Sequence, residues 1–240
     1  MGSISPMLRL LLISNSTMHG HGYLAHVSDE IREFLAGLES LLFVPWALAD
    51  HEDYANKAAS ALEPLGIRLD SIHRAADPLQ AIREAQAVFI GGGNTFRLLD
   101  QLQRTGAAEV IAARARSGMP YMGSSAGTNV ATVSIRTTND MPIVQPANFA
   151  ALGLVPFQIN PHYLDANPAT THMGETREER IMQFHEENST AVLGLREGGW
   201  VRREDGMVEL RGLTNARLFE QGKAPRELEP GTDLTFLMAD

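Results

Sequence analysis

Short apolar runs alternate with amphipathic stretches along the first two thirds of this 240-residue chain. The apolar runs have the length of strands, and the stretches between them repeat apolar residues at helical spacing. Such alternation builds a mostly parallel sheet with helices on both faces, so we expect a three-layer α/β sandwich. The predicted strands are 8–14, 41–46, 67–72, 87–90 and 119–123, and the predicted helices are 23–37, 53–62, 77–86, 94–103, 107–117 and 126–133.

The last third of the chain follows a different pattern. Thr176 and Glu179 have the spacing of a capping box, which predicts a helix that continues to about Glu187. A strand is predicted over 191–196, and the glycine-containing turn signals after it indicate an antiparallel hairpin. Because no linker, repeat or low-complexity run divides residues 1–240, we expect a single domain with a small antiparallel C-terminal extension.

Composition excludes several classes of function. The chain has 20 Lys and Arg against 29 Asp and Glu, and its net charge of −9 argues against nucleic acid or an anionic membrane as a partner. It has no cysteine, which excludes disulfides, a cysteine nucleophile and thiolate metal sites. The first apolar run is far shorter than the ~20 residues that span a bilayer and lacks the pattern of a signal peptide, so we expect a cytoplasmic location.

Residues 123–127 carry the sharpest chemical signal, with the sequence Gly-Ser-Ser-Ala-Gly. A Gly-x-Ser-x-Gly pattern between a predicted strand and a predicted helix is typical of a nucleophile elbow. Ser125 is then the candidate nucleophile, ahead of Ser124, and the amide of Ala126 at the helix N-terminus is placed to stabilise an oxyanion. The alternative is that these serines only cap the helix.

A serine nucleophile needs a base, and the base needs an acid that orients it. His162 is the candidate base, because it follows a proline at the end of an apolar stretch, where a side chain is held well. Two carboxylates compete for the third role: Asp140 in a polar loop after the elbow, and Glu197 at a strand end. Chain order does not choose between them, since triads are defined by geometry.

Two further groups of residues are candidate ligand sites, a glycine-rich turn and a histidine pair. The glycines 91–93 follow a predicted strand, and their amides suit an oxyanion hole, but the turn lacks the lysine of a phosphate-binding loop. Asn94 after them is also a plausible helix cap. His19 and His21 form a His-x-His pair, yet no carboxylate lies nearby at ligand spacing, so we expect no metal site here.

Segments across nearly the whole chain resemble the peptidase E family of serine peptidases, which also contains cyanophycinases. The matching segments are 12–17, 72–79, 90–96, 123–127, 135–144, 159–162 and 174–177. The resemblance implies hydrolysis of dipeptides with an N-terminal aspartate, without metal or cofactor. It also implies a sheet fold akin to the class I glutamine amidotransferases, with serine in place of cysteine at the elbow.

Carried over by position, the resemblance implies four roles: nucleophile Ser125, base His162, and oxyanion donors at the amides of Gly92 and Ala126. For the third triad member it implies either Asp140 or Glu197. We favour Glu197 as the imidazole partner, with Asp140 shaping the substrate pocket. Relatives often have tryptophan before the nucleophile, where this chain has Ser124, a difference that bears on fine substrate preference.

A substrate aspartate must meet a cation or convergent donors, because burying its carboxylate unpaired is costly. Arginine suits this task, since its guanidinium binds carboxylates in a bidentate manner. The candidates for binding the carboxylate are Arg177, Arg180 and Arg136, and those for the α-amino group are Asp140 and Glu175. Asn94 is a further candidate substrate-binding residue.

The expected partner is therefore a small peptide, bound by a monomer or homodimer. Two alternatives stay open at this point. One is a cyanophycinase-like or other serine acyl hydrolase that uses the same serine. The other is a non-enzymatic module that binds an acidic metabolite at the glycine-rich turn.

Overall fold

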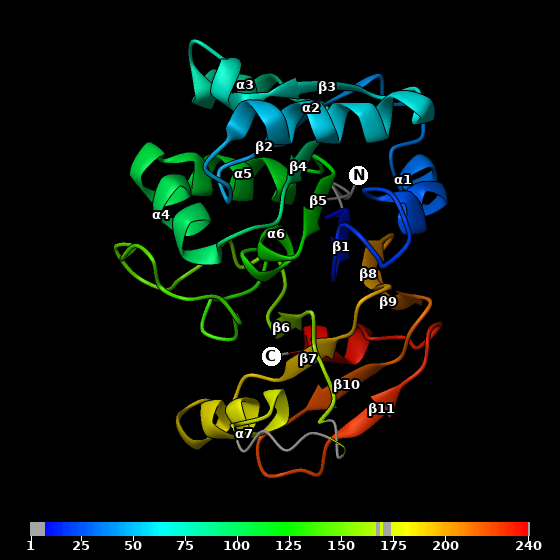
Figure 1. The fold of residues 1–240 in the computed structure, drawn as a ribbon, viewed down its shortest axis with the longest axis vertical. Helices are drawn as coiled ribbons and strands as arrows, with labels where there is room; N and C mark the ends of the chain where they lie inside the picture. Colours follow the sequence, from blue (N-terminus) through cyan, green and yellow to red (C-terminus); the bar gives the residue numbers. More distant parts are fainter. Residues whose placement is uncertain (1–7, 167–168, 170–173, 240) are drawn as a thin grey trace, which may run out of the picture.

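The computed structural model describes residues 8–166, 169 and 174–239, which form two β-sheets with flanking helices (Figure 1). The strands of the large sheet run in the order β3-β2-β4-β5-β1-β8-β9. They are β1 (Leu10–Ile13), β2 (Ser40–Val44), β3 (Arg68–Ser71), β4 (Val88–Ile90), β5 (Tyr121–Ser124), β8 (Gly199–Glu204) and β9 (Met207–Gly212). Strands β1 to β5 pair in parallel, and β8 and β9 extend the sheet antiparallel beside β1.

Helices cover both faces of this sheet. The α-helices are α1 (Ser28–Phe34), α2 (His51–Leu62), α3 (Pro78–Glu84), α4 (Thr95–Thr105), α5 (Ala107–Arg116), α6 (Ala126–Asn129) and α7 (Arg177–Glu187), with short 3-10 helices at Ala25–Val27, Glu63–Leu65, Ile72–Arg74 and Thr235–Met238. Within the described part of the chain, none of these helices has the length and apolarity needed to cross a membrane.

Strand β1 shows why the two faces are buried. Leu11 and Ile13 belong to a hydrophobic cluster with residues of α1 and α2. Leu10 and Leu12 point the other way, into a cluster with residues of α3, α4 and α5. A strand buried on both faces is apolar at every position, which explains the uninterrupted apolar runs of the sequence. The predicted three-layer arrangement with a mostly parallel sheet is confirmed.

The smaller sheet gathers strands from distant parts of the chain. It contains β6 (Gln158–Pro161), β7 (Val192–Leu195), β10 (Ala216–Phe219) and β11 (Arg226–Leu228), in the order β11-β10-β7-β6. Strand β6 pairs with β7 in parallel, and the other two pairs are antiparallel. The antiparallel hairpin β8–β9 is confirmed, but the strand predicted before it belongs to this second sheet. The second sheet packs into the same core as the large sheet. The hydrophobic cluster that contains Leu10 of β1 also contains Ile159, Leu193 and Leu218 of the second sheet.

Two predicted helices are shorter than expected. The helix predicted over 23–37 is interrupted at Leu24, which has a left-handed φ of 58°, and α1 begins only at Ser28. The helix predicted over 126–133 stops with α6. The carbonyls of the three residues after α6 accept hydrogen bonds from the amides of 152–154, so they are not free to continue a helix.

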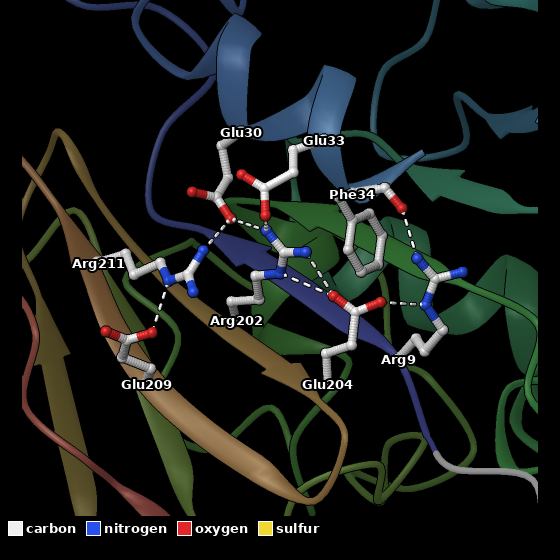
Figure 2. Close-up of polar contacts among 8 residues, drawn as sticks. All are labelled: Arg9, Glu30, Glu33, Phe34, Arg202, Glu204, Glu209 and Arg211. Atoms are coloured by element: carbon white, nitrogen blue, oxygen red, sulfur yellow. Dashed lines mark hydrogen bonds and ion pairs between the residues drawn. The ribbon is translucent and has the colours of Figure 1, made fainter. Parts of the chain in front are cut away.

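A cluster of charged side chains joins α1 to the antiparallel edge of the sheet (Figure 2). Arg202 on β8 is only 8% exposed. Its Nη1 atom lies 2.8 Å from Glu30 Oε1 and 2.7 Å from Glu33 Oε1, both on α1. Arg211 on β9 also reaches Glu30, at 3.0 Å. The carboxylate of Glu30 is thus held by two guanidinium groups.

Glu204 continues the cluster toward the start of the chain. Burial opposes its ionisation, but hydrogen bonds from Arg202 and Arg9 outweigh that effect and hold the pKa of Glu204 below its usual value. Arg9 contacts Glu204 Oε1 at 2.6 Å and also donates to the backbone oxygen of Phe34 at the end of α1. The carboxylates in this cluster act as paired ions, which makes each partner costly to remove.

We predict that Arg202→Ala lowers the free energy of unfolding by about 3 kcal/mol, because Glu30 and Glu204 each lose one of two guanidinium partners and, within the described chain, keep only Arg211 and Arg9. Arg32→Ala is the matched control, since Arg32 lies on α1 and forms an exposed pair with Asp29. We expect the control to change stability by about 0.5 kcal/mol or less. Urea unfolding at neutral pH measures both; equal losses would contradict a stabilising role for the buried cluster.

Candidate active site

Ser125 lies in the turn between β5 and α6 with φ of 54° and ψ of −109°. A positive φ is strained for a residue other than glycine and persists only where the surroundings fix it. Here the Ser125 amide donates to the carbonyl of Ile13 at 3.0 Å, and its carbonyl accepts from the amides of Thr128 and Asn129 at 2.9 Å. The strained conformation is therefore held from both sides.

The two glycines of the motif are required by close backbone approach. A Cβ atom on Gly123 would lie 2.5 Å from the carbonyl oxygen of Gly127. A Cβ atom on Gly127 would run into the carbonyl oxygen of Ile90 in the neighbouring strand. The Gly-x-Ser-x-Gly pattern thus lets strand and helix pack at a distance that exposes the central serine.

His162 brings a base and an acid to this serine. Its Nε2 atom lies 2.9 Å from Ser125 Oγ, and its Nδ1 atom lies 2.7 Å from Glu197 Oε1. His162 directly follows β6, and Glu197 comes two residues after β7. The hydroxyl, imidazole and carboxylate form one continuous line of contacts, which is the arrangement that activates a serine nucleophile.

Two buried residues at the end of β1 hold this arrangement in place. Ser14 Oγ accepts a hydrogen bond from the His162 amide at 3.0 Å and donates one to the Leu195 carbonyl at 2.8 Å. Asn15 Oδ1 accepts from the amide of Gly198, next to Glu197, at 2.8 Å. Sequence reasoning missed Ser14 and Asn15 as supporting residues, although they lie at the end of the predicted strand 8–14 and within the matching segment 12–17.

The predicted oxyanion donors lie beside the nucleophile. A Cβ atom on Gly92 would be 3.0 Å from the Cβ of Ser125, so the glycine turn after β4 lies against the elbow. Ala126 is the first residue of α6, and its amide has no acceptor within the helix. Gly92 and Ala126 therefore both lie next to Ser125.

Asp140 lies in a different setting from Glu197. Its Oδ2 atom accepts from the amide and the hydroxyl of Thr95, at 2.8 and 2.6 Å, and from the hydroxyl of Thr138 at 3.2 Å. A carboxylate at a helix N-terminus is stabilised by the helix dipole, and Thr95 is the first residue of α4. Asp140 therefore fastens its loop to α4, while the imidazole contact belongs to Glu197.

Asn94 uses both ends of its side chain for structure. Its Oδ1 atom caps α4 by accepting from the amide of Arg97 at 3.0 Å. Its amide group donates to the carbonyl of Met141 at 2.9 Å.

Ser124 is fully buried, and within the described residues its hydroxyl has no hydrogen-bond partner.

The three candidate arginines differ in environment. Arg177 is half-buried at the start of α7, and among the residues that the structure describes it forms no ion pair. Burial lowers the pKa of Arg177, and the nearby charge of Asp140 partly opposes this. Arg180 is exposed and lies 3.7 Å from Glu175. Arg136 is exposed and stacks on an aromatic ring, at the rim of a cavity that Asp140 and Arg180 also line.

The His-x-His pair lies in the loop after β1. Over residues 8–166, 169 and 174–239, no group of three or more histidine, aspartate or glutamate side chains is arranged to hold a metal ion.

Comparison with known proteins identifies the family to which the chain belongs. The sequence model of peptidase family S51 matches residues 10–211. Peptidase E of Streptomyces coelicolor is 56% identical over 96% of this chain and 95% of its own. A probable alpha-aspartyl dipeptidase of Drosophila melanogaster is 49% identical over 95% and 97% of the two chains. Peptidase E of Salmonella newport is 44% identical over 93% and 99%.

Solved structures agree with this relationship. A putative peptidase E protein from Listeria monocytogenes superposes with a TM-score of 0.66 at 26% identity, covering 87% of this chain and 100% of the other. A peptidase from an acI-B1 actinobacterium has a TM-score of 0.70 at 14% identity over 96% and 97% of the chains, which supports the fold alone. The protein is a peptidase, and the chain belongs to peptidase family S51. The resemblance seen in the sequence is confirmed.

We predict that Ser14→Ala lowers the free energy of unfolding by about 1–3 kcal/mol, because the His162 amide loses its acceptor and the Leu195 carbonyl keeps, among the described residues, only the Tyr163 amide as a donor. Ser60→Ala is the control, since Ser60 is exposed and its hydroxyl only bonds the backbone of its own helix. Urea denaturation measures both variants. A Ser14→Ala variant as stable as the control would contradict the bridging role.

Proposed function

We propose that this peptidase is a serine dipeptidase that hydrolyses dipeptides with an N-terminal aspartate. The observation that carries the proposal is the contact line from Ser125 through His162 to Glu197 at the elbow. The name of the Drosophila relative, a probable alpha-aspartyl dipeptidase, supports the substrate class, since it aligns over nearly the whole chain.

The proposed reaction is acyl transfer. Ser125 Oγ attacks the aspartyl carbonyl carbon and forms a C–O bond, while His162 Nε2 accepts the hydroxyl proton. Glu197 orients the imidazole and stabilises its positive charge. The tetrahedral oxyanion accepts hydrogen bonds from the amides of Gly92 and Ala126.

Collapse of this intermediate breaks the C–N bond, and His162 gives its proton to the leaving amine. A water molecule then attacks the acyl-enzyme, again with His162 as base. The ester bond to Ser125 breaks, the serine recovers its proton, and aspartate leaves.

Substrate recognition in this proposal depends on Arg177, which binds the side-chain carboxylate of the aspartate. Its support is a half-buried guanidinium that has no ion pair among the described residues. The α-ammonium group is assigned to Asp140 or Glu175, the two carboxylates near the same end of α7. Arg136 at the exposed rim contributes long-range attraction, and Asn94 acts by holding the loop that carries Asp140.

The alternatives have less support. Relatives at 44–56% identity over nearly the full chain carry the names peptidase E and probable alpha-aspartyl dipeptidase, so a cyanophycinase-like activity is not favoured. A binding module would have no need for a base and an acid aligned on a serine. The proposal places the enzyme in the cytoplasm with small peptides as its partners, and a chain without cysteine needs no oxidising compartment.

We predict that Ser125→Ala and His162→Ala each lower kcat on aspartyl p-nitroanilide roughly 10³-fold or more. Glu197→Gln should lower kcat about 10²- to 10⁴-fold, since it removes the charge that orients the imidazole. Asp140→Asn is the comparison for the third role: its main effect should fall on KM and on stability. Release of p-nitroaniline measures all four, with urea unfolding as the check on folding. Full activity of Ser125→Ala would remove the nucleophile assignment.

We predict that Arg177→Gln lowers kcat/KM on aspartyl p-nitroanilide about 10- to 100-fold. A loss of this size corresponds to the free energy that one hydrogen-bonded contact with a charged carboxylate contributes to binding. Arg180→Gln, one turn along α7 and already beside Glu175, should stay within a few-fold of the wild-type protein. Steady-state kinetics on the two variants provide the measurement. Equal losses, or a loss confined to Arg180→Gln, would reject Arg177 as the aspartate-binding cation.

A further inference from the structure

A second cavity opens beside the nucleophile on the side of α2. It has a volume of about 560 Å³, within the range of roughly 300–1,000 Å³ that is typical of small-ligand sites. Its lining includes Ser125, His162, Tyr23, Tyr54 and Lys57. It shares none of these residues with the cavity lined by Asp140 and Arg136. The nucleophile therefore opens onto a cavity that Arg136, Asp140 and Arg180 do not line.

Lys57 brings an available cation to this cavity. Its Nζ atom lies 5.2 Å from the centroid of the Tyr23 ring, a cation–π contact. Among the residues described, no carboxylate lies within ion-pair distance of it. The sequence contains one other lysine, Lys223, which pairs with Glu220 at 2.9 Å. The charge of Lys57 is thus free for a ligand.

The wall beneath Lys57 is rigid and tied to the reaction centre. Tyr23 Oη donates to Tyr54 Oη at 3.2 Å, and the rings meet edge to face. Tyr54 also packs edge to face on Phe43, with centroids 5.0 Å apart. Its hydroxyl fills the space where a Cβ on Gly91 would lie, 2.5 Å away, next to the glycine that flanks Ser125. Burial raises the pKa of Tyr23 and Tyr54, so both hydroxyls stay neutral at physiological pH.

Two acidic residues restrict where an anion can bind in this cavity. Asp50 and Asp53 line it together with Lys57. Asp50 Oδ1 caps α2 by accepting from the Asp53 amide at 2.9 Å, and Lys57 lies one turn further along the same helix. A ligand carboxylate is therefore repelled from the start of α2 and attracted to the Lys57 end.

We propose that Lys57, held over the Tyr23–Tyr54 wall, binds the C-terminal carboxylate of the dipeptide on the leaving-group side of Ser125. The inference rests on the proposed function. A dipeptide with N-terminal aspartate has two carboxylates, and if Arg177 takes the side-chain one, the C-terminal one needs its own cation. A longer peptide has a neutral amide at that position, so this contact selects dipeptides over longer chains.

The test compares three substrates: Asp-Leu, its C-terminal amide, and aspartyl p-nitroanilide, the last two without a C-terminal carboxylate. The proteins are the wild type, Lys57→Gln, Lys57→Arg, and Lys223→Gln as the matched loss of a lysine elsewhere. Lys57→Gln should lower kcat/KM on Asp-Leu about tenfold or more, mainly through KM, and leave the two substrates without a C-terminal carboxylate unchanged. Lys57→Arg should recover most of the loss, and Lys223→Gln should match the wild type.

Two results would overturn the subsite. The first is wild-type activity of Lys57→Gln on Asp-Leu. The second is an equal loss of activity on all three substrates, which would mean that Lys57 binds the aspartate or supports folding. A wild-type protein that cleaves none of the three substrates would instead overturn the proposed function and, with it, this use of the cavity.

Discussion

The end of strand β1 is the point on which the site depends. The carbonyl of Ile13 accepts both the amide of Ser125 and the hydroxyl of Thr128, at 3.0 and 2.7 Å. The next residue, Ser14, bridges His162 and Leu195. One short buried strand thus sets the elbow and the base relative to each other, although they are far apart in the sequence. Parallel strands of a sheet end at the same edge, which is where ligands bind in such sheets. The end of β1 lies at this edge, beside the elbow after β5 of the large sheet and His162 after β6 of the smaller sheet.

Charge is distributed around this junction with a clear division of roles. The buried pairs of Arg202 join α1 to the sheet, and the loop that leads from β1 to α1 carries Tyr23 toward the cavity. Arg177 and Lys57 have no ion pairs within the described residues; Lys57 lines the cavity beside Ser125, and Arg177 lies near Asp140. In the proposed function, these two cations bind the two carboxylates of the substrate.

Local sequence patterns predict much of the fold, but they do not predict the pairing of strands that are distant in the sequence. The buried strands, the capping box at Thr176 and the elbow at 123–127 follow from residues close together in the sequence. The parallel pairing of β6 with β7, Gln158 against Val192, joins residues too distant for any local pattern to predict. The choice between Asp140 and Glu197 was open for the same reason, since only geometry shows which carboxylate meets the imidazole.

The central claim is that Ser125 is a nucleophile activated by His162 in a site that binds aspartyl dipeptides. The most direct test is labelling with a fluorophosphonate, followed by peptide mass mapping, in the presence and absence of Asp-Leu. The account predicts a single label on Ser125, slowed by Asp-Leu and abolished in His162→Ala. An enzyme that cleaves Asp-Leu but carries no label on Ser125, or labels equally without His162, would contradict it.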